Sequence, residues 1–312
     1  MCLYSPAMRA AVLACILVAA CHAPPPSGGQ LDAHGGPMID AAIDGAIPPG
    51  WTMLIGRSWS LTPSQQTYKC TRVQVATDMW INAFRSLQPI GTHHEVLTID
   101  TNDTHTGDYD CTAGSGTLNG QMLYAAGINT DDLAFPDGVA VHLAAGTWIN
   151  LNLHLFDVSD NTESGMSGVL VKTIDQTAVV HEADMTFSGT FNISIPSDGQ
   201  PHTASGGCTA PVDWHVFALW PHMHQLGTHQ TLTVTHAGTT TTELDTPYMF
   251  SEQRNYPMAE TIYHAGDQIL TTCTYVNNTG QTVTFGDSST AEMCFTGLYK
   301  YPAGSNTFSC AM

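Results

Sequence analysis

The sequence predicts an all-β protein: two antiparallel, jelly-roll-like β-sandwich domains in tandem, after a signal peptide and a Pro/Gly-rich tether. Three observations indicate this class. Short β-branched or alternating apolar runs recur through residues 51–312, and clusters of Gly, Asn, Asp and Pro separate them. Apolar residues show a helical repeat only in a weak candidate at residues 77–84. No sequence repeat of fixed period is present, which disfavours a propeller or a solenoid.

Residues 1–21 are expected to be a signal peptide. Arg9 precedes an unbroken apolar stretch over residues 10–20, which is about half the length needed to span a bilayer. The segment ends in Val18-Ala19-Ala20-Cys21, which resembles a bacterial lipobox, in which the cysteine becomes lipidated. An ordinary cleaved signal peptide is the alternative. Both predict an exported protein, either lipid-anchored to a bacterial membrane (periplasmic or cell surface) or secreted.

Residues 22–50 are rich in Pro and Gly and are expected to form a flexible tether. A boundary after residue 182 would divide the remainder into an N-terminal sandwich (51–182) and a C-terminal sandwich (183–312), each of ordinary domain size. Strands are expected at residues 71–75, 96–100, 148–156, 169–174, 215–220, 231–235, 268–275 and 282–285.

The charge balance argues against nucleic acid as a partner. The chain has 8 Lys+Arg against 27 Asp+Glu and a formal net charge of −19, so it has too few cations to neutralise a phosphate backbone. An acidic surface is also repelled by anionic lipid headgroups. We therefore expect membrane contact only through the N-terminal anchor, and we expect a monomer.

The cysteines after residue 21 are even in number, which in an exported protein predicts disulfides. No Cys-x-x-Cys pair occurs among them, so three bridges are favoured over a thiolate metal site, although their pairing stays open. These cysteines are Cys70, Cys111, Cys208, Cys273, Cys294 and Cys310.

His222 and His224 are one residue apart at the end of an apolar run. On an extended chain both imidazoles project from the same face, a spacing that suits one metal ion. Two core histidines satisfied by hydrogen bonds alone are the alternative.

Three earlier histidines are weaker signals. His93 and His94 are adjacent, so in a regular strand they would point to opposite faces, and they could share a metal only if the backbone bends there. A surface turn is the alternative. His154 shares one strand face with Asn150 and Asn152, and this face meets either solvent or a site.

Together these motifs resemble the copper type II, ascorbate-dependent monooxygenases, the family of peptidylglycine α-hydroxylating monooxygenase and dopamine β-monooxygenase. The resemblance covers most of residues 60–312 and lies in the order and spacing of several motifs. It implies two coppers, one held by His93, His94 and His154 and the other by His222, His224 and Met293. Imidazole binds copper in both oxidation states and a thioether favours Cu(I). Met293 is assigned through its Glu-Met-Cys context, because a methionine otherwise usually fills gaps in a core.

The resemblance implies an oxidoreductase that acts on paired donors with incorporation of molecular oxygen. Ascorbate would reduce both coppers, and dioxygen would react at the catalytic site of His222, His224 and Met293, where a substrate C–H bond is hydroxylated. The second electron would come from the other copper across a solvent-filled cleft. The resemblance also implies the disulfides Cys70–Cys111, Cys208–Cys310 and Cys273–Cys294.

The chain departs from the family at positions that bind substrate. Where the peptide-amidating members carry an Arg, an Asn and a Tyr that grip a carboxylate, this chain has Trp220, Phe295 and Gly297. We therefore expect a small, neutral, apolar or aromatic substrate, with Trp220 and Phe295 as walls of its pocket. Glu95, next to the histidine pair, is either a solvated strand residue or a carboxylate that raises the basicity of a ligand imidazole.

Two other classes of function stay open. The chain could be a non-catalytic exported copper-binding protein for storage or delivery, or an adhesive β-sandwich whose histidines are incidental. Ascorbate-driven oxygen uptake coupled to a product separates an enzyme from the first class. Loss of copper on His222→Ala excludes the second.

Overall fold

The structure is a computed structural model that describes residues 47–100, 102–114, 120–128 and 130–311. The chain there is almost entirely β-strand, with one 3-10 turn, η1 (Gln176–Ala178). This confirms the all-β prediction. Within the described ranges, no helix has the length and apolar character needed to cross a membrane. The expected signal peptide, Cys21 and most of the tether lie outside the described residues.

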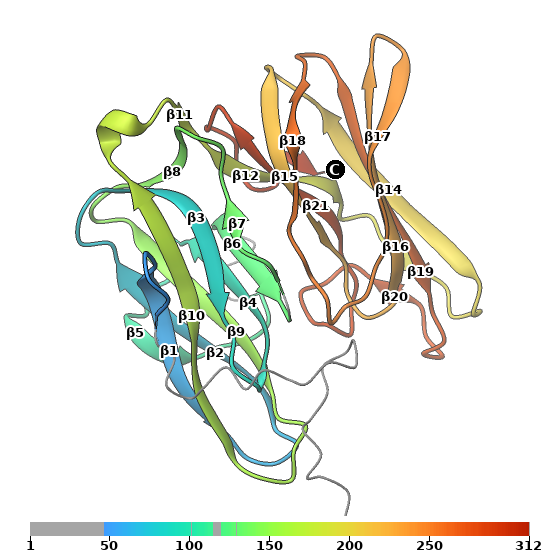
Figure 1. The fold of residues 1–312 in the computed structure, drawn as a ribbon. Helices are drawn as coiled ribbons and strands as arrows, with labels where there is room; N and C mark the ends of the chain where they lie inside the picture. The colour runs from blue at the N-terminus through green and yellow to red at the C-terminus, as the bar shows by residue number, and fades with distance from the viewer. Residues whose placement is uncertain (1–46, 101, 115–119, 129, 312) are drawn as a thin grey trace, which may run out of the picture. The chain divides into compact units, whose positions relative to one another are not determined.

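The first eleven strands, here called the N-terminal group, form two sheets (Figure 1). The Phe84 ring of one sheet stacks on the Tyr124 ring of the other, so the sheets pack face to face as a sandwich. One sheet has the order β1 (Thr52–Leu61), β10 (Glu163–Ile174), β3 (Met79–Leu87), β8 (Val139–Leu143), β11 (His181–Glu182), with β7 (Leu133–Ala134) paired to β3. The other has the order β5 (Gly107–Asp110), β2 (Gln66–Gln74), β9 (Trp148–Phe156), β4 (Thr92–Ile99), β6 (Gln121–Gly127).

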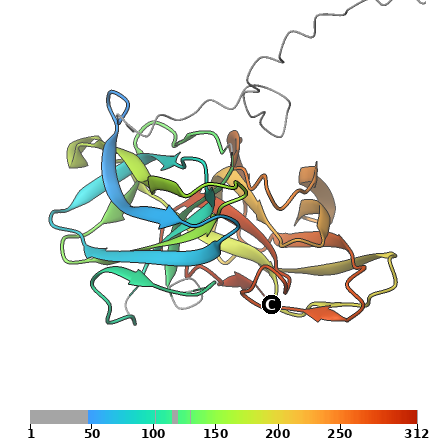
Figure 2. The same ribbon diagram turned by 90° about the horizontal axis from the view of Figure 1, so that it is seen from below.

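The remaining strands, the C-terminal group, form a second sandwich, distinguished by colour in Figure 1 and in the turned view of Figure 2. One sheet has the order β18 (Tyr256–Tyr263), β15 (Trp214–His222), β21 (Cys294–Tyr301), β12 (Asp184–Thr190), β22 (Cys310–Ala311). The other has the order β14 (Pro201–Thr209), β19 (Gln268–Val276), β16 (Gly227–His236), β17 (Thr239–Pro247). A small ribbon pairs β13 (Ser194–Ile195) with β20 (Val283–Thr284).

Strand pairing in the described chain stays within each group, and the predicted boundary after residue 182 falls between β11 and β12. The described residues nevertheless belong to one compact unit. The largest cluster of buried side chains draws on both groups, and in it Phe135 contacts Phe217 at 4.8 Å between ring centroids. That the two groups fold as separate domains stays a prediction.

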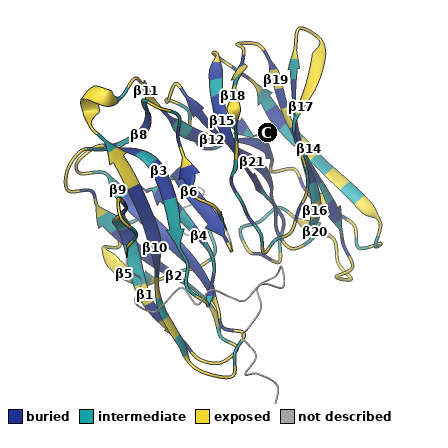
Figure 3. Ribbon diagram, viewed as in Figure 1, coloured by how far each residue is buried: buried dark blue, intermediate teal, exposed yellow. Residues whose placement is uncertain are grey.

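The central strands are buried on both faces, which explains their long apolar runs. Strands β9, β15 and β21 consist almost wholly of buried residues (Figure 3). These strands position the candidate ligands: β9 contains His154, β15 ends at His222, and β21 begins directly after Met293. A rigid, fully packed strand therefore lies beneath each candidate metal site.

The expected strands are all present, and the helical candidate is wrong. Residues 77–84 lie largely in β3, which pairs with β10 and β8. Ile81 and Ala83 are buried while Asn82 between them is partly exposed, which is the period of two of a β-strand. Three nearby apolar residues obscure this alternation in the sequence.

Within the described residues there are three disulfides, the same three that the family resemblance implies. They are Cys70–Cys111, Cys208–Cys310 and Cys273–Cys294. Cys273 in β19 and Cys294 in β21 join the two sheets of the C-terminal group beside Met293. Structural disulfides are typical of proteins that fold in an oxidising compartment outside the cytosol.

Candidate metal sites and the adjoining pocket

The first histidine cluster consists of His93, His94 and His154, on the neighbouring antiparallel strands β4 and β9. His94 lies directly opposite His154, and the strand register shifts between Thr92 and His94. Such a bulge breaks the alternation of side chains along β4. It supplies the backbone irregularity that two adjacent histidines need in order to face one metal ion.

The Nδ1 atoms of the first cluster converge. Nδ1 of His94 lies 3.1 Å from Nδ1 of His93 and 3.4 Å from Nδ1 of His154, and the cluster fits within 4.8 Å overall. Burial lowers the pKa of His93. It lowers the pKa of His94 well below the usual value and the pKa of His154 to about 4. Neighbouring histidines also lower the pKa of His94 and of His154. Neutral imidazoles are the form that binds metal ions.

Residues of β2 hold His154 in place. Tyr68, directly opposite it, stacks on its ring at 4.5 Å between centroids. The side-chain amide of Gln66 lies 2.7 Å from Nε2 of His154. The Gln66 atom at this distance is the amide nitrogen, which donates to Nε2 and leaves the ring proton on Nδ1, the nitrogen that faces the cluster.

The second cluster consists of His222, His224 and Met293. The two imidazole rings are 5.2 Å apart and almost perpendicular. Nδ1 of His222 contacts Oε1 of Gln253 at 2.9 Å, and Nδ1 of His224 contacts the Ala291 carbonyl oxygen at 3.1 Å. Since both partner atoms are acceptors, each Nδ1 donates its proton and each Nε2 keeps a lone pair for a metal.

Burial also keeps the second cluster neutral. It lowers the pKa of His222 to about 3 and that of His224 to about 4. Met293 is buried and lines the same pocket as both histidines, and the Tyr275 hydroxyl donates to its carbonyl oxygen at 2.8 Å. The sulfur-bearing residue and the histidine pair therefore meet at one place.

Glu292 links the two parts of this second cluster. Its carboxylate accepts the backbone N–H of His224 at 2.9 Å and that of Leu226 at 2.6 Å. Burial raises the pKa of Glu292 to about 7 against the lowering effect of these bonds. In the sequence Glu292 stands out only as context for Met293, because nothing in the local pattern shows that it binds a backbone more than sixty residues away.

Comparison with known proteins shows what the chain is similar to. A family model described as copper type II ascorbate-dependent monooxygenase, C-terminal domain, matches residues 181–312, which contain the whole second cluster. The peptidyl-glycine alpha-amidating monooxygenase B of Xenopus laevis is 26% identical over 250 residues. Residues 181–312 therefore resemble the C-terminal domain of the copper type II ascorbate-dependent monooxygenases. The match covers 75% of this chain and 28% of the Xenopus relative, so the chain spans little more than a quarter of that relative's length.

Solved structures add no further argument. The chain is similar to the turret protein A223 of Sulfolobus turreted icosahedral virus, with 10% identity over 80% of this chain and 98% of that chain and a TM-score of 0.19. It is also similar to the VP2 subviral particle of infectious bursal disease virus, with 11% identity over 82% and 78% of the chains and a TM-score of 0.19. Likenesses this weak carry no conclusion.

The donor atoms fit the copper that gives this monooxygenase family its name. Three imidazole nitrogens converge in the first cluster, where their lone pairs can bind a single cation. In the second cluster, two imidazoles with Nδ1 engaged and a soft thioether form a donor set that accommodates Cu(I).

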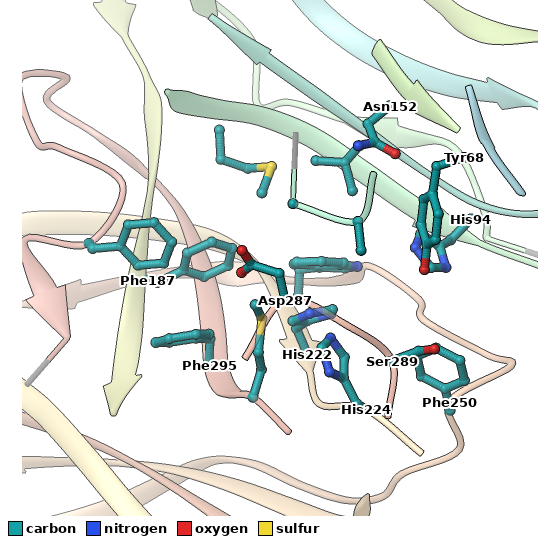
Figure 4. Close-up of a pocket in the computed structure, with 17 residues that line it drawn as sticks. Tyr68, His94, Asn152, Phe187, His222, His224, Phe250, Asp287, Ser289 and Phe295 are labelled. Carbon is teal, nitrogen blue, oxygen red and sulfur yellow. The ribbon is translucent and has the colours of Figure 1, made fainter. Parts of the chain in front are cut away.

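A largely aromatic pocket adjoins the second cluster (Figure 4). Trp220 and Phe295, the two walls expected from the departures from this monooxygenase family, both line it, with Phe187 and Phe308. At Gly297, the third departure, a Cβ would lie 2.0 Å from Cε of Met185, so a larger residue there would require the Met185 side chain to move.

Asp287 is a pocket residue that the sequence analysis missed. Figure 4 shows its carboxylate among the aromatic side chains near His222. Its Oδ1 atom is buried without a hydrogen-bond partner, and burial raises the pKa of this group. The pocket therefore combines apolar walls with one unsatisfied carboxylate oxygen. A lone Asp in a Gly-Asp-Ser turn offers no sequence signal for this position.

Glu95 is not a solvated strand residue, the first of its two expected roles. It is fully buried on the core face of β4, and burial raises its pKa well above the usual value. Its carboxyl oxygens make no hydrogen bond to an imidazole, so the alternative of a carboxylate that tunes a ligand is not observed either. Glu95 follows a bulged position, and this local irregularity directs it inward.

The other histidines make separate contacts. His229, considered for a supporting role near the His-x-His motif, instead lies 2.8 Å from Asp245 at the surface. The remaining ones do not join the two clusters in the described structure.

Proposed function

We propose that this protein is a copper-dependent monooxygenase that hydroxylates a C–H bond of a small organic substrate, using O2 and a reductant such as ascorbate. One observation carries the proposal: imidazoles converge in two histidine clusters, and the two clusters use opposite ring nitrogens. The first presents Nδ1 atoms and the second presents Nε2 atoms.

Each cluster would hold one copper. His93, His94 and His154 would bind through Nδ1, and His222 and His224 would bind through Nε2 with the Met293 sulfur. Bound copper supplies the one-electron redox chemistry that activation of O2 requires. The protein keeps the imidazoles neutral by burial and orients the rings through their second nitrogens.

The pocket supports a small, apolar or aromatic substrate. Its walls include Trp220 and Phe295, which offer ring faces and no cation. The Asp287 carboxylate would repel a substrate carboxylate, which disfavours peptides ending in glycine. A preference for carboxylate-terminated peptides in a substrate screen would overturn this part of the proposal.

The proposed location is outside the cytosol, with the chain either anchored through a lipid on Cys21 or secreted after cleavage of residues 1–21. We further propose that it acts as a monomer on a small molecule. Intact-mass measurement of the mature N-terminus distinguishes the two forms, because acylation adds a mass that simple cleavage does not.

Copper stoichiometry tests the proposed function first. Protein expressed without residues 1–21 should retain two coppers per chain after dialysis, and His93→Ala and His222→Ala should each retain one. His229→Ala, which removes a surface imidazole paired with Asp245, is the matched control and should retain two. Ascorbate-driven O2 uptake should then appear with a hydroxylated product. Two coppers without turnover would favour a storage or delivery protein, and none would refute the metal sites.

A further inference from the structure

The loop between β17 and β18, residues 248–255, reaches both histidine clusters, and we call it the bridging loop. At its start, the Tyr248 hydroxyl donates to the Met223 carbonyl oxygen at 2.6 Å, between His222 and His224. Near its end, Gln253 binds Nδ1 of His222. The bridging loop is therefore fastened to the second cluster at two points.

The same loop is fastened to the N-terminal group. The Gln253 carbonyl oxygen accepts the Gly127 N–H at 3.1 Å and the Thr130 hydroxyl at 2.8 Å. The approach is so close that a Cβ at position 127 would lie 2.8 Å from the Gln253 nitrogen. Asn255 adds a longer contact to the Ala125 carbonyl oxygen at 3.4 Å.

Between these attachments, the ring of Phe250 contacts both clusters. Its centroid lies 5.0 Å from that of His93 and 6.1 Å from that of His94 in the first cluster. It lies 6.0 Å from that of His224 in the second, and Figure 4 shows it beside His94 and His224. All three separations fall within the range of direct aromatic contact. The resemblance implies a solvent-filled cleft between the coppers, whereas here a phenyl ring occupies part of that space.

We propose that Phe250 is a positioning residue that sets the separation of the two histidine clusters and keeps water out of the space between them. The inference rests on the proposed function, since the separation matters only if both clusters hold metals that act together. A phenyl ring suits this role because it is rigid, is held by backbone contacts on either side of it, and offers no ligand atom that competes for copper. Truncation to alanine would leave space beside polar imidazoles, where water can bind.

The test begins with metal-free protein, so that it does not depend on copper. Exchange of the imidazole Cε1 hydrogen with deuterium, read by mass spectrometry of peptides, reports the access of water to individual histidines. Phe250→Ala should raise the exchange rate several-fold at His94 and His224, and Phe250→Leu should raise it less. Met249→Ala, which truncates the exposed neighbour on the same loop, is the matched control and should leave both rates unchanged.

The second readout uses the copper-loaded protein. Both Phe250 variants should retain two coppers, but pulsed EPR between the Cu(II) ions should show a shifted or broader distance distribution than in the wild type and Met249→Ala. Unchanged exchange rates and an unchanged distribution in Phe250→Ala would overturn the proposal. If that variant does not fold, Phe250→Leu decides by the same comparison. If the wild type binds fewer than two coppers, the proposed function fails, while the exchange experiment still judges the role of Phe250.

Discussion

At the scale of single residues, the partner of one imidazole nitrogen decides which nitrogen faces the metal site. The Gln253 oxygen engages Nδ1 of His222, and the Ala291 carbonyl engages Nδ1 of His224. In the first cluster, Gln66 lies at Nε2 of His154 and leaves Nδ1 inward. These partners fix ring orientation before any metal binds, which lowers the entropy cost of binding.

Replacing Gln253 with leucine should weaken copper binding at the second cluster about 10- to 100-fold, because His222 loses the acceptor that fixes its tautomer and ring orientation. Competition with a copper chelator measures the affinity of each site. The first cluster should keep its affinity. Gln74→Leu, at an amide that contacts only the Gly146 carbonyl, is the control. Equal losses in both variants would contradict the role of Gln253.

The stability of the metal-free protein should fall as the pH drops below about 6.5. The pKa of His222 is about 3 and those of His154 and His224 are about 4 in the folded chain, whereas an unfolded histidine titrates near 6.5. Below pH 6.5 the unfolded chain therefore binds more protons than the folded one, and each such group favours unfolding increasingly down to its folded pKa. Thermal midpoints measured across this range check the expectation.

The variant His222→Gln sharpens the pH test. It removes one group that titrates only on unfolding, so the fall in melting temperature between about pH 6.5 and pH 4 should be shallower than in the wild type. His229→Gln, at a surface ion pair, should keep the wild-type slope. Identical slopes in all three proteins would show that the buried imidazoles do not govern acid stability.

At the scale of elements, irregular strand geometry and cross-links position the ligands. The register shift in β4 lets two adjacent histidines serve one site, where a regular strand would separate them. In the C-terminal group, the Cys273–Cys294 bridge and the Tyr275 hydrogen bond hold the start of β21, just after Met293. The thioether is thereby held against the sheet that ends in the histidine pair.

Removing the Cys273–Cys294 bridge with two serines should cost about 2–4 kcal/mol of unfolding free energy and weaken copper binding at the second cluster. Removing Cys208–Cys310 in the same way is the matched control. It spans 102 residues against 21, so its effect on stability should be at least as large while copper binding persists. Denaturant unfolding and copper stoichiometry measure the two effects. Loss of copper from both double variants would mean that the Cys273–Cys294 bridge supports copper binding only through the overall stability of the protein.

At the scale of the whole molecule, the two groups of strands share buried side chains although their hydrogen-bonded sheets are separate. Phe135 of the N-terminal group packs on Phe217 and Tyr299 of the C-terminal group. The bridging loop adds hydrogen bonds across the same boundary. This shared packing couples the stability of the two clusters, because each cluster belongs to a different group.

Phe135→Ala should destabilise the chain by about 3–5 kcal/mol and should affect both groups of strands. Amide hydrogen exchange followed by peptide mapping should show faster exchange in β3 and β6 and also in β15 and β21. Val158→Ala, at an exposed residue, is the control and should change neither group. Faster exchange confined to the N-terminal group would mean that the groups unfold independently, as tandem domains do.

The sequence by itself determined the fold class and most of the strands, and it indicated His222 and His224 as a candidate pair of metal ligands. Alternation with a period of two is a local property, so His154 could be placed on the polar face of its strand, and a His-x-His spacing could be read without the fold. The identity of Met293 and the three disulfides needed the family resemblance as well, because composition leaves their partners open.

Tertiary structure alone decided which atoms meet. Gln253 and Phe250 come from a loop without a pattern, and Asp287 is an ordinary turn residue until aromatic rings from distant strands surround it. The burial of Glu95 could not be predicted from the sequence either, because it follows from a β-bulge that has no sequence pattern. Local periodicity specifies the face on which a side chain lies. Contacts between residues far apart in the chain arise only when the sheets pack, and that packing brings histidines of both clusters into contact with one phenyl ring.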